Sequence, residues 1–187
     1  MNEQLTLDLQ PVQEVYRIAL TQGQFALVDF EDYYRLIRFK WQAHWNPSTQ
    51  CFRAQRGGNR DGKRCTVLMH REIMHAPDGT DVDHRDHDEL NNRKANLRLA
   101  TKHQNSQNKR KLKPGKSGYK GVRHSKRCTQ RPWEARIGTA GKISLGYFAT
   151  REAAFEAYKV AAREVYGEFA CFDSPAVTRA AELLEQM

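Results

Sequence analysis

The stretch VDHRDHDELNNRKANLRLATKHQNSQN, Val82 to Asn108, decides which fold this sequence predicts. Its first eight residues, Val82 to Glu89, contain three Asp, one Glu and two His. Such a cluster is either a site for metal binding and proton transfer or a solvated acidic loop that holds two histidines. The choice depends on how the rest of the stretch folds.

The stretch has the pattern of two short strands followed by a helix. A strand is expected over residues 81–84, then a polar loop, then a second, apolar strand over residues 96–100. Thr101 is a typical N-cap residue, so a helix begins there and carries side-chain amides in its first turns. The sequence therefore predicts a β-loop-β-helix unit with Asp83 and His84 on its first strand.

Asp83, His84 and an amide of this helix have the chemistry needed to hydrolyse a phosphodiester with the help of a metal. A hard divalent cation such as Mg²⁺ prefers oxygen ligands, which carboxylates and amides supply. A histidine with a pKa of about 6.5 can take a proton from water at neutral pH. Adjacent residues of a regular strand point to opposite faces, however, so both side chains share one site only if the strand bends or bulges.

The longer segment HREIMHAPDGTDVDHRDHDELNNRKANLRLATKHQNSQN, residues 70–108, resembles the HNH endonuclease family, in the branch common in phages and homing endonucleases. The shared features are an early His, Pro-x-Gly, V-D-H, N-N-R, N-L-R and Q-N-x-x-N. The resemblance implies a ββα-metal finger with a distorted first strand. It makes His84 the general base, Asn92 the middle motif asparagine that orders the loop, and Asp83 and Asn105 the ligands of one Mg²⁺ or Mn²⁺ ion.

Other polar residues of this segment have less specific interpretations. Asn96 resembles a structural asparagine before the second strand, and the final motif position is Asn rather than His. His70 is either a packed, hydrogen-bonded structural residue or a ligand, and we favour the structural role. His87 stands where relatives usually have Gly or a small residue; we expect it, like Asp88, to be solvated.

The charge of the chain is distributed very unevenly. The net charge is +9, but residues 90–133 alone carry 14 Lys or Arg and no Asp or Glu. Residues 1–89 have a net charge of −3 and residues 134–187 a net charge of −2. An acid-free segment of this length attracts a polyanion and releases its counterions on binding, so nucleic acid is the first candidate partner.

Several classes of protein are disfavoured by composition. No apolar run approaches the roughly 20 residues of a transmembrane helix, and the amino terminus lacks the pattern of a secretory signal. The four cysteines form no C-x-x-C pair, which disfavours a structural zinc knuckle. We therefore expect a cytoplasmic protein of a bacterial or phage-infected cell, without a membrane partner or an evident protein partner.

The residues before the nuclease-like segment predict a β-rich extension. Strands are expected over 16–20 and 24–29, followed by a short helix over 31–39. A β-hairpin then follows, with the charged segment Gly57 to Arg64 as its turn and 65–69 as its second strand.

The residues after the nuclease-like segment predict a separate small module. KLKPGKSG, Lys111 to Gly118, has the composition of a linker. Three strands are expected over 119–124, 132–138 and 143–148, followed by a helix that begins after the N-cap Thr150 and ends near Gly167. One apolar stripe on the helix would cover the apolar face of the sheet.

Residues 118–167 resemble the AP2/ERF DNA-binding domain through YKGVR, WEARI, LGYF and TREAAFEAY, in that order. The resemblance implies a three-stranded antiparallel sheet that lies in the DNA major groove with one helix behind it. By position, the DNA-contacting residues are Lys120, Arg123, Arg136 and Lys142, which suit guanine or phosphate. Ser144 replaces an aromatic residue of plant-type relatives, which leaves the sequence preference open.

The predicted fold class is α+β: a ββα-metal HNH finger with an N-terminal β-rich extension, then a three-stranded antiparallel sheet packed on one helix. The expected domains are an HNH nuclease domain with its extension (1–111), a linker (112–117), an AP2/ERF-like domain (118–173) and a short tail (174–187). The predicted function is a metal-dependent endonuclease acting on double-stranded DNA and targeted by the C-terminal module. Two alternatives remain: a non-catalytic AP2-type transcriptional regulator with a scaffold HNH unit, and a structural RNA-binding protein.

Overall fold

The computed structural model describes residues 14–110, 116–138 and 142–172. Small antiparallel sheets and a few helices make up these residues, as the predicted α+β class requires. The predicted tail (174–187) and most of the predicted linker (112–117) lie outside them. At the end of that linker, Ser117 is buried, and its hydroxyl donates to the carbonyl oxygen of Val122 over 2.7 Å.

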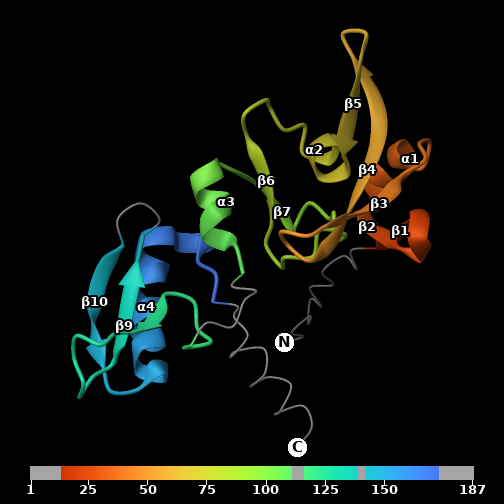
Figure 1. The fold of residues 1–187 in the computed structure, drawn as a ribbon. Helices are drawn as coiled ribbons and strands as arrows, with labels where there is room; N and C mark the ends of the chain where they lie inside the picture. Colours follow the sequence, from red (N-terminus) through yellow and green to blue (C-terminus); the bar gives the residue numbers. More distant parts are fainter. Residues whose placement is uncertain (1–13, 111–115, 139–141, 173–187) are drawn as a thin grey trace, which may run out of the picture.

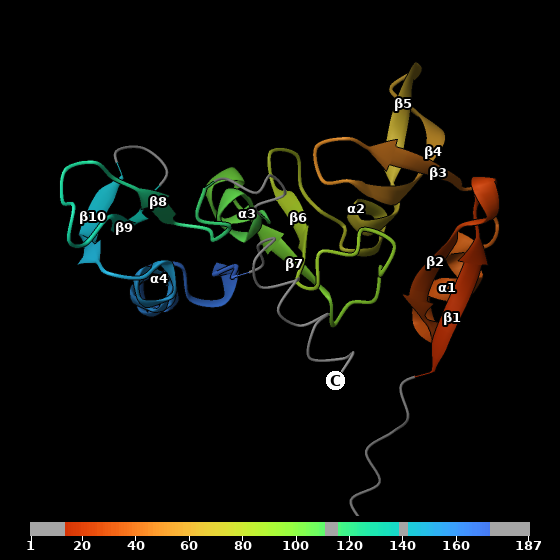
Figure 2. The ribbon, with the colours of Figure 1, turned by 60° about the horizontal axis from the view of Figure 1, so that its bottom comes forward.

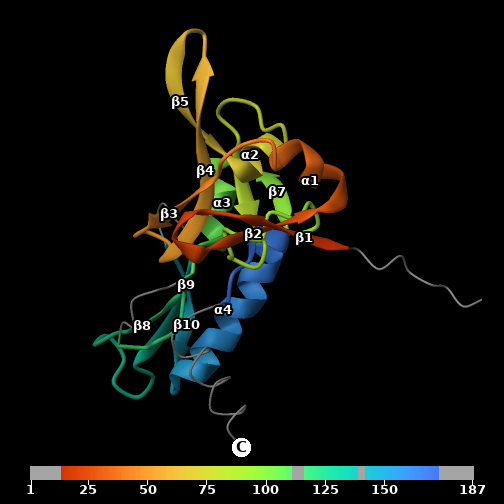
Figure 3. The same ribbon diagram turned by 90° about the vertical axis from the view of Figure 1, so that its right-hand side faces the viewer.

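The N-terminal part contains two small sheets and two short helices. Its elements are β1 (Val15–Ala19), β2 (Phe25–Asp29), α1 (Phe30–Leu36), β3 (Gln42–Asn46), β4 (Cys51–Arg60), β5 (Lys63–Leu68) and α2 (Met69–Ile73), with a 3-10 turn, η1 (Thr21–Gly23), after β1. β1 pairs with β2, and β3, β4 and β5 form an antiparallel sheet in that order. The β4–β5 hairpin projects from the rest of the chain (Figure 3).

The predicted hairpin turn over Gly57 to Arg64 is wrong in extent. β4 continues to Arg60, and the turn consists of Asp61 and Gly62, whose φ angles are 53° and 76°. Two positive φ angles in a two-residue loop match the right-handed twist of the flanking strands, and Asp-Gly is a preferred pair there. The second strand of this hairpin was predicted over 65–69, but β5 ends at Leu68. Met69 instead begins α2, a five-residue helix that the sequence did not indicate.

The ββα unit lies in the middle of the molecule (Figures 1 and 2). It consists of β6 (Asp81–His84), β7 (Leu97–Ala100) and α3 (Lys102–Asn108). β6 pairs with β7 in a regular antiparallel register from Asp81–Ala100 to His84–Leu97. The register contains no bulge, so the distortion of the first strand that the family resemblance implied is absent from the pairing.

The C-terminal module is a three-stranded antiparallel sheet with one long helix against it, as predicted. Its elements are β8 (Val122–His124), β9 (Trp133–Ile137), β10 (Ile143–Phe148), α4 (Arg151–Tyr166) and the 3-10 turn η2 (Gly167–Phe169). The strand order is β10-β9-β8. Gly121 allows the helix to approach closely: its φ is 72°, and a Cβ there would lie 2.1 Å from the Tyr158 ring.

Two apolar cores stabilise these parts. The first joins the N-terminal extension to the ββα unit, with Val28, Leu36, Met69, Val82 and Leu97 among its buried members. The second lies between α4 and its sheet and includes Val122, Ile137, Phe155 and Tyr158. The N-terminal extension therefore supports the ββα unit from behind.

Candidate active site

A pocket of about 460 Å³ opens where the β3-β4-β5 sheet, α2 and the ββα unit meet. The polar residues that matter most among those lining it are Arg53, His70, Asp81, Asp83, His84, Asn105 and Asn108. The structure thus brings three predicted site residues, Asp83, His84 and Asn105, to one pocket. The fourth, Asn92, is buried and does not line the pocket.

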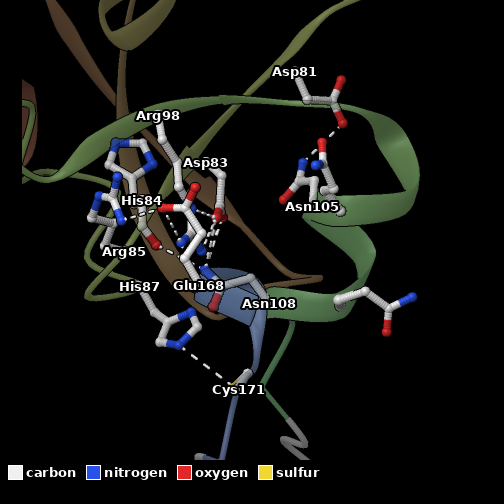
Figure 4. Close-up of polar contacts among 12 residues, drawn as sticks. Asp81, Asp83, His84, Arg85, His87, Arg98, Asn105, Asn108, Glu168 and Cys171 are labelled. Carbon is white, nitrogen blue, oxygen red and sulfur yellow. Dashed lines mark hydrogen bonds and ion pairs between the residues drawn. The ribbon is translucent and has the colours of Figure 1, made fainter. Parts of the chain in front are cut away.

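Asp83 is buried, and its carboxylate is held from two sides (Figure 4). Arg98 of β7 donates to its Oδ2 through Nε over 2.8 Å and forms an ion pair through Nη2 at 2.7 Å. Asn108 of α3 donates to Oδ1 over 2.9 Å and to Oδ2 over 3.0 Å. These contacts orient the carboxylate, and Oδ2 receives more of them than Oδ1.

The predicted ligand pair Asp83 and Asn105 is not in direct contact. Asn105 donates through Nδ2 to Oδ2 of Asp81 over 2.9 Å, and Figure 4 shows this pair apart from the contacts of Asp83. The helical asparagine that touches Asp83 is instead Asn108, one turn further along α3. Because the Asn105 bond uses the amide nitrogen, the amide oxygen of Asn105 takes no part in it.

His84 is buried, and its Nε2 has no hydrogen-bond partner among the residues that the structure describes. The ring meets that of His70 edge-on, with 5.1 Å between the centroids. Burial lowers the pKa of His84 below its ordinary value, and this effect outweighs the nearby Glu89, Asp86 and Asn92, which raise it. His84 is therefore neutral at pH 7, with an imidazole nitrogen able to accept a proton.

The loop between the strands is held by its own polar side chains. Asn92 donates through Nδ2 to the carbonyl oxygens of Leu90 and Glu89 over 3.1 and 3.3 Å. Asp86 accepts from the Asn96 amide over 2.8 Å and from the Asn91 amide over 2.6 Å. Asp86 thus organises the loop. The sequence did not suggest this role, because Asp86 lies in a run of acidic residues that is typical of a solvated loop.

His70 and His87 occupy different environments. His70 is buried, as expected for a structural residue, but no described residue forms a hydrogen bond with its Nδ1. Burial, together with the positive charges of nearby residues, lowers its pKa to about 3. His87 has a φ of 64°, which explains why a glycine would suit this position, and its Nε2 lies 3.6 Å from Sγ of Cys171.

The donors at the pocket fit a hard divalent cation. Within the described part of the chain, Asp83 Oδ1 accepts a hydrogen bond from Asn108 alone. The Asn105 amide oxygen is the kind of neutral donor that completes such a site with water. Among the described residues, no three His, Cys, Asp or Glu side chains lie close enough together to hold a metal ion. A site here would therefore depend on one carboxylate, amide oxygens and water rather than on a carboxylate cluster.

The four predicted DNA-binding residues meet on the C-terminal module. Lys120, Arg123, Arg136 and Lys142 all line a second pocket of about 440 Å³, which also touches α3. Lys120 donates to the carbonyl oxygens of Gln107 and Lys109 at the end of α3, so it also connects the two modules. The structure thus assembles one basic cluster from residues distant in the sequence.

A buried carboxylate, Glu134, lies within this basic cluster. It accepts from Arg123 Nε over 2.7 Å, and Arg136 Nε lies 4.0 Å from it. Burial alone would raise the pKa of Glu134, but hydrogen bonds from Ser144 and Arg123 keep it below its ordinary value. Glu134 therefore stays ionised and holds the two arginines in place on the surface of the sheet.

Comparisons with known proteins agree with the ββα unit. Residues 75–107 match the family model described as HNH endonuclease. An uncharacterised HNH endonuclease of Acanthamoeba polyphaga mimivirus is 40% identical over 89 residues, which cover 48% of this chain and 44% of the relative. The match thus spans less than half the length of that relative.

No solved structure matches the chain. The HNH resemblance is confirmed over residues 75–107, whereas the AP2/ERF resemblance stays a prediction. No described helix is long and apolar enough to cross a membrane.

Three residues of the site were not predicted as such. Asn108 is the last residue of the Q-N-x-x-N motif, and Arg98 belongs to N-L-R, so the motif itself contained a signal for both. Glu168 contacts Arg98 from the C-terminal module, 70 residues away, and no local pattern indicates this.

Proposed function

We propose that the protein is a divalent-metal-dependent DNA endonuclease whose ββα unit hydrolyses phosphodiester bonds. One observation carries the proposal: a segment that matches HNH endonucleases places the Asp83 carboxylate and the unpartnered Nε2 of His84 at a single pocket. Buried polar atoms without partners are uncommon in folded proteins and concentrate where a ligand or a reaction needs them.

In this proposal the residues of the pocket have different roles. His84, neutral at pH 7, takes a proton from the attacking water through Nε2. Asp83, oriented by Arg98 and Asn108, and Asn105 would hold one Mg²⁺ or Mn²⁺ ion. When bound, this ion supplies Lewis acidity toward the phosphate. Asn92 keeps the loop beside His84 in a fixed shape.

The basic cluster of the C-terminal module supports double-stranded DNA as the substrate. Lys120, Arg123, Arg136 and Lys142 lie around one pocket on a module with the architecture expected of an AP2-type reader. In this proposal the module holds the enzyme on DNA while the ββα unit cleaves. The enzyme would act in the cytoplasm of a bacterial or phage-infected cell.

The proposal is tested by incubating supercoiled plasmid with the full chain and Mg²⁺, Mn²⁺ or EDTA. We expect nicked or linear DNA with metal only, and a loss of at least about a hundredfold in His84→Ala, because general-base catalysis contributes roughly 10²–10⁴-fold. His75→Ala removes an exposed histidine and serves as the matched control, with activity near that of the wild type.

The second candidate function is a non-catalytic DNA-binding regulator. The basic cluster favours it as much as it favours a nuclease, because both require DNA binding. If the wild-type protein binds DNA but cleaves none with either metal, the regulator is the correct interpretation and the nuclease proposal fails.

A further inference from the structure

The end of the C-terminal module reaches into the nuclease unit. The turn η2 contains Glu168 and Phe169, and both contact Arg98, the residue that holds Asp83. Figure 4 shows Glu168 beside Arg98. Arg98 Nη1 donates to the main-chain oxygen of Glu168 and lies 3.4 Å from its Oε2. The Arg98 guanidinium also stacks over the Phe169 ring at 3.9 Å from the centroid.

Arg98 is fully engaged by these contacts. Its side chain is 7% exposed, with Nε and Nη2 directed to Asp83 and Nη1 to Glu168. A guanidinium buried in this way has little capacity left for a further ligand such as a phosphate. The role of Arg98 is therefore to position Asp83. The turn η2 in turn positions Arg98 through the contacts of Glu168 and Phe169.

Two carboxylates and two guanidinium groups lie together here, because Glu168 also forms an ion pair with Arg85 at 2.6 Å. Asp83 and Glu168 together carry −2 against the +2 of Arg98 and Arg85, so this cluster is neutral beside the pocket. Without the Glu168 charge, Arg98 and Arg85 would leave a net charge of +1 around Asp83, and the attraction of the site for a divalent cation would fall. The Glu168 side chain is 54% exposed, so solvent screening reduces this effect but does not remove it.

We infer that Glu168 is a positioning residue of the nuclease site, which acts through Arg98 to set the affinity of Asp83 for the divalent cation. The C-terminal module would then complete the metal site of the ββα unit as well as hold DNA. This inference rests on the proposed nuclease function.

The test measures the direct binding of Mn²⁺, without DNA, to full-length Glu168→Gln and to the wild type. Electron paramagnetic resonance of the free ion reports the binding. The substitution keeps the main-chain contact and the size of the side chain and removes only the charge. We expect the Kd for Mn²⁺ to rise roughly three- to tenfold. Cleavage by Glu168→Gln should fall at low Mg²⁺ and recover at high Mg²⁺, with the KM for DNA unchanged or lower.

Asp78→Asn is the matched control. It removes the same charge from an exposed ion pair with Arg60, on a loop that does not line the pocket. We expect wild-type Mn²⁺ affinity in this control and near-wild-type affinity in Glu168→Asp, which keeps the charge.

The outcomes separate the inference from the proposed function. If the wild type cleaves DNA and Glu168→Gln binds Mn²⁺ as tightly as the wild type does, the inference is wrong and the nuclease proposal stands. A lower melting temperature of Glu168→Gln with unchanged Mn²⁺ affinity would also overturn it, because Glu168 would then only dock the module. A wild type that neither binds Mn²⁺ nor cleaves DNA contradicts both.

Discussion

At the scale of single residues, the site depends on the different surroundings of two adjacent residues, Asp83 and His84. Asp83 faces Arg98 and Asn108, which keep a charged carboxylate satisfied in a buried position. His84 faces the His70 ring, and no residue in the described ranges bonds to its Nε2. Burial therefore favours the neutral form of His84. The alternation of a regular strand thus separates the proposed ligand from the proposed base, and both still line one pocket at the end of β6.

The buried histidines make stability dependent on pH. The pKa of His70 falls from about 6.5 in the unfolded chain to about 3 in the fold, so protonation favours unfolding. The stabilisation is complete above pH 6.5 and is lost as the pH falls below it. Between pH 6.5 and 5 we expect a loss of about 2 kcal/mol from His70 in the free energy of unfolding, measured by urea denaturation.

His70→Gln tests the assignment of this pH dependence. It removes the titrating ring, so its free energy of unfolding should fall less than that of the wild type between pH 6.5 and 5. The carboxylates Glu134 and Glu168 have lowered pKa values and act at lower pH, so they contribute little in this window. Equal losses in the variant and the wild type would contradict the prediction.

At the scale of elements, local signals explain most of the agreement between sequence and structure. Thr101 begins α3 with a capping box: its Oγ1 accepts from Gln104 N over 3.2 Å, and Gln104 Oε1 accepts from Thr101 N over 2.9 Å. Strand alternation and a Thr150 cap indicated the C-terminal module equally well. The helix α2 escaped prediction because five residues are too few to show a helical period.

Removal of the Thr101 cap should weaken the ββα unit. A helix of seven residues is marginal by itself, so we expect Thr101→Ala to lower the free energy of unfolding by about 1 kcal/mol. Cleavage should fall as well, because α3 carries Asn105 and Asn108. Thr101→Ser keeps the hydroxyl and should restore both stability in urea and cleavage; if it matches Thr101→Ala instead, the cap is not the cause.

At the scale of the whole molecule, charge and docking join the two modules. The acid-free segment 90–133 runs through β7, α3 and β8, so it contributes cations to both modules. Lys120 and Arg98 cross between the modules in opposite directions, one reaching the end of α3 and the other reaching η2. The modules are therefore coupled on two sides of the ββα unit.

The basic cluster predicts a salt dependence that can be measured. Lys142 is exposed at the second pocket, and Lys142→Gln should weaken DNA binding and reduce the slope of log K against log salt by about one. Lys63→Gln, on the β4–β5 hairpin, removes the same charge from an exposed position outside that pocket. Fluorescence anisotropy with a short duplex at several salt concentrations distinguishes them, and equal slopes for the two variants would contradict a role for Lys142.

The sequence by itself determined the order and type of most elements, α2 excepted, because caps, alternation and turn residues act over a few positions. It also predicted that Asp83, His84 and Asn105 would lie at one site, because the HNH motif is short and continuous. Only the tertiary structure decided that Asn108 rather than Asn105 touches Asp83, since one helical turn separates them and packing selects between them. The contact of Glu168 with Arg98 was also decided there, because it depends on how two separate cores dock, and no local pattern records that geometry.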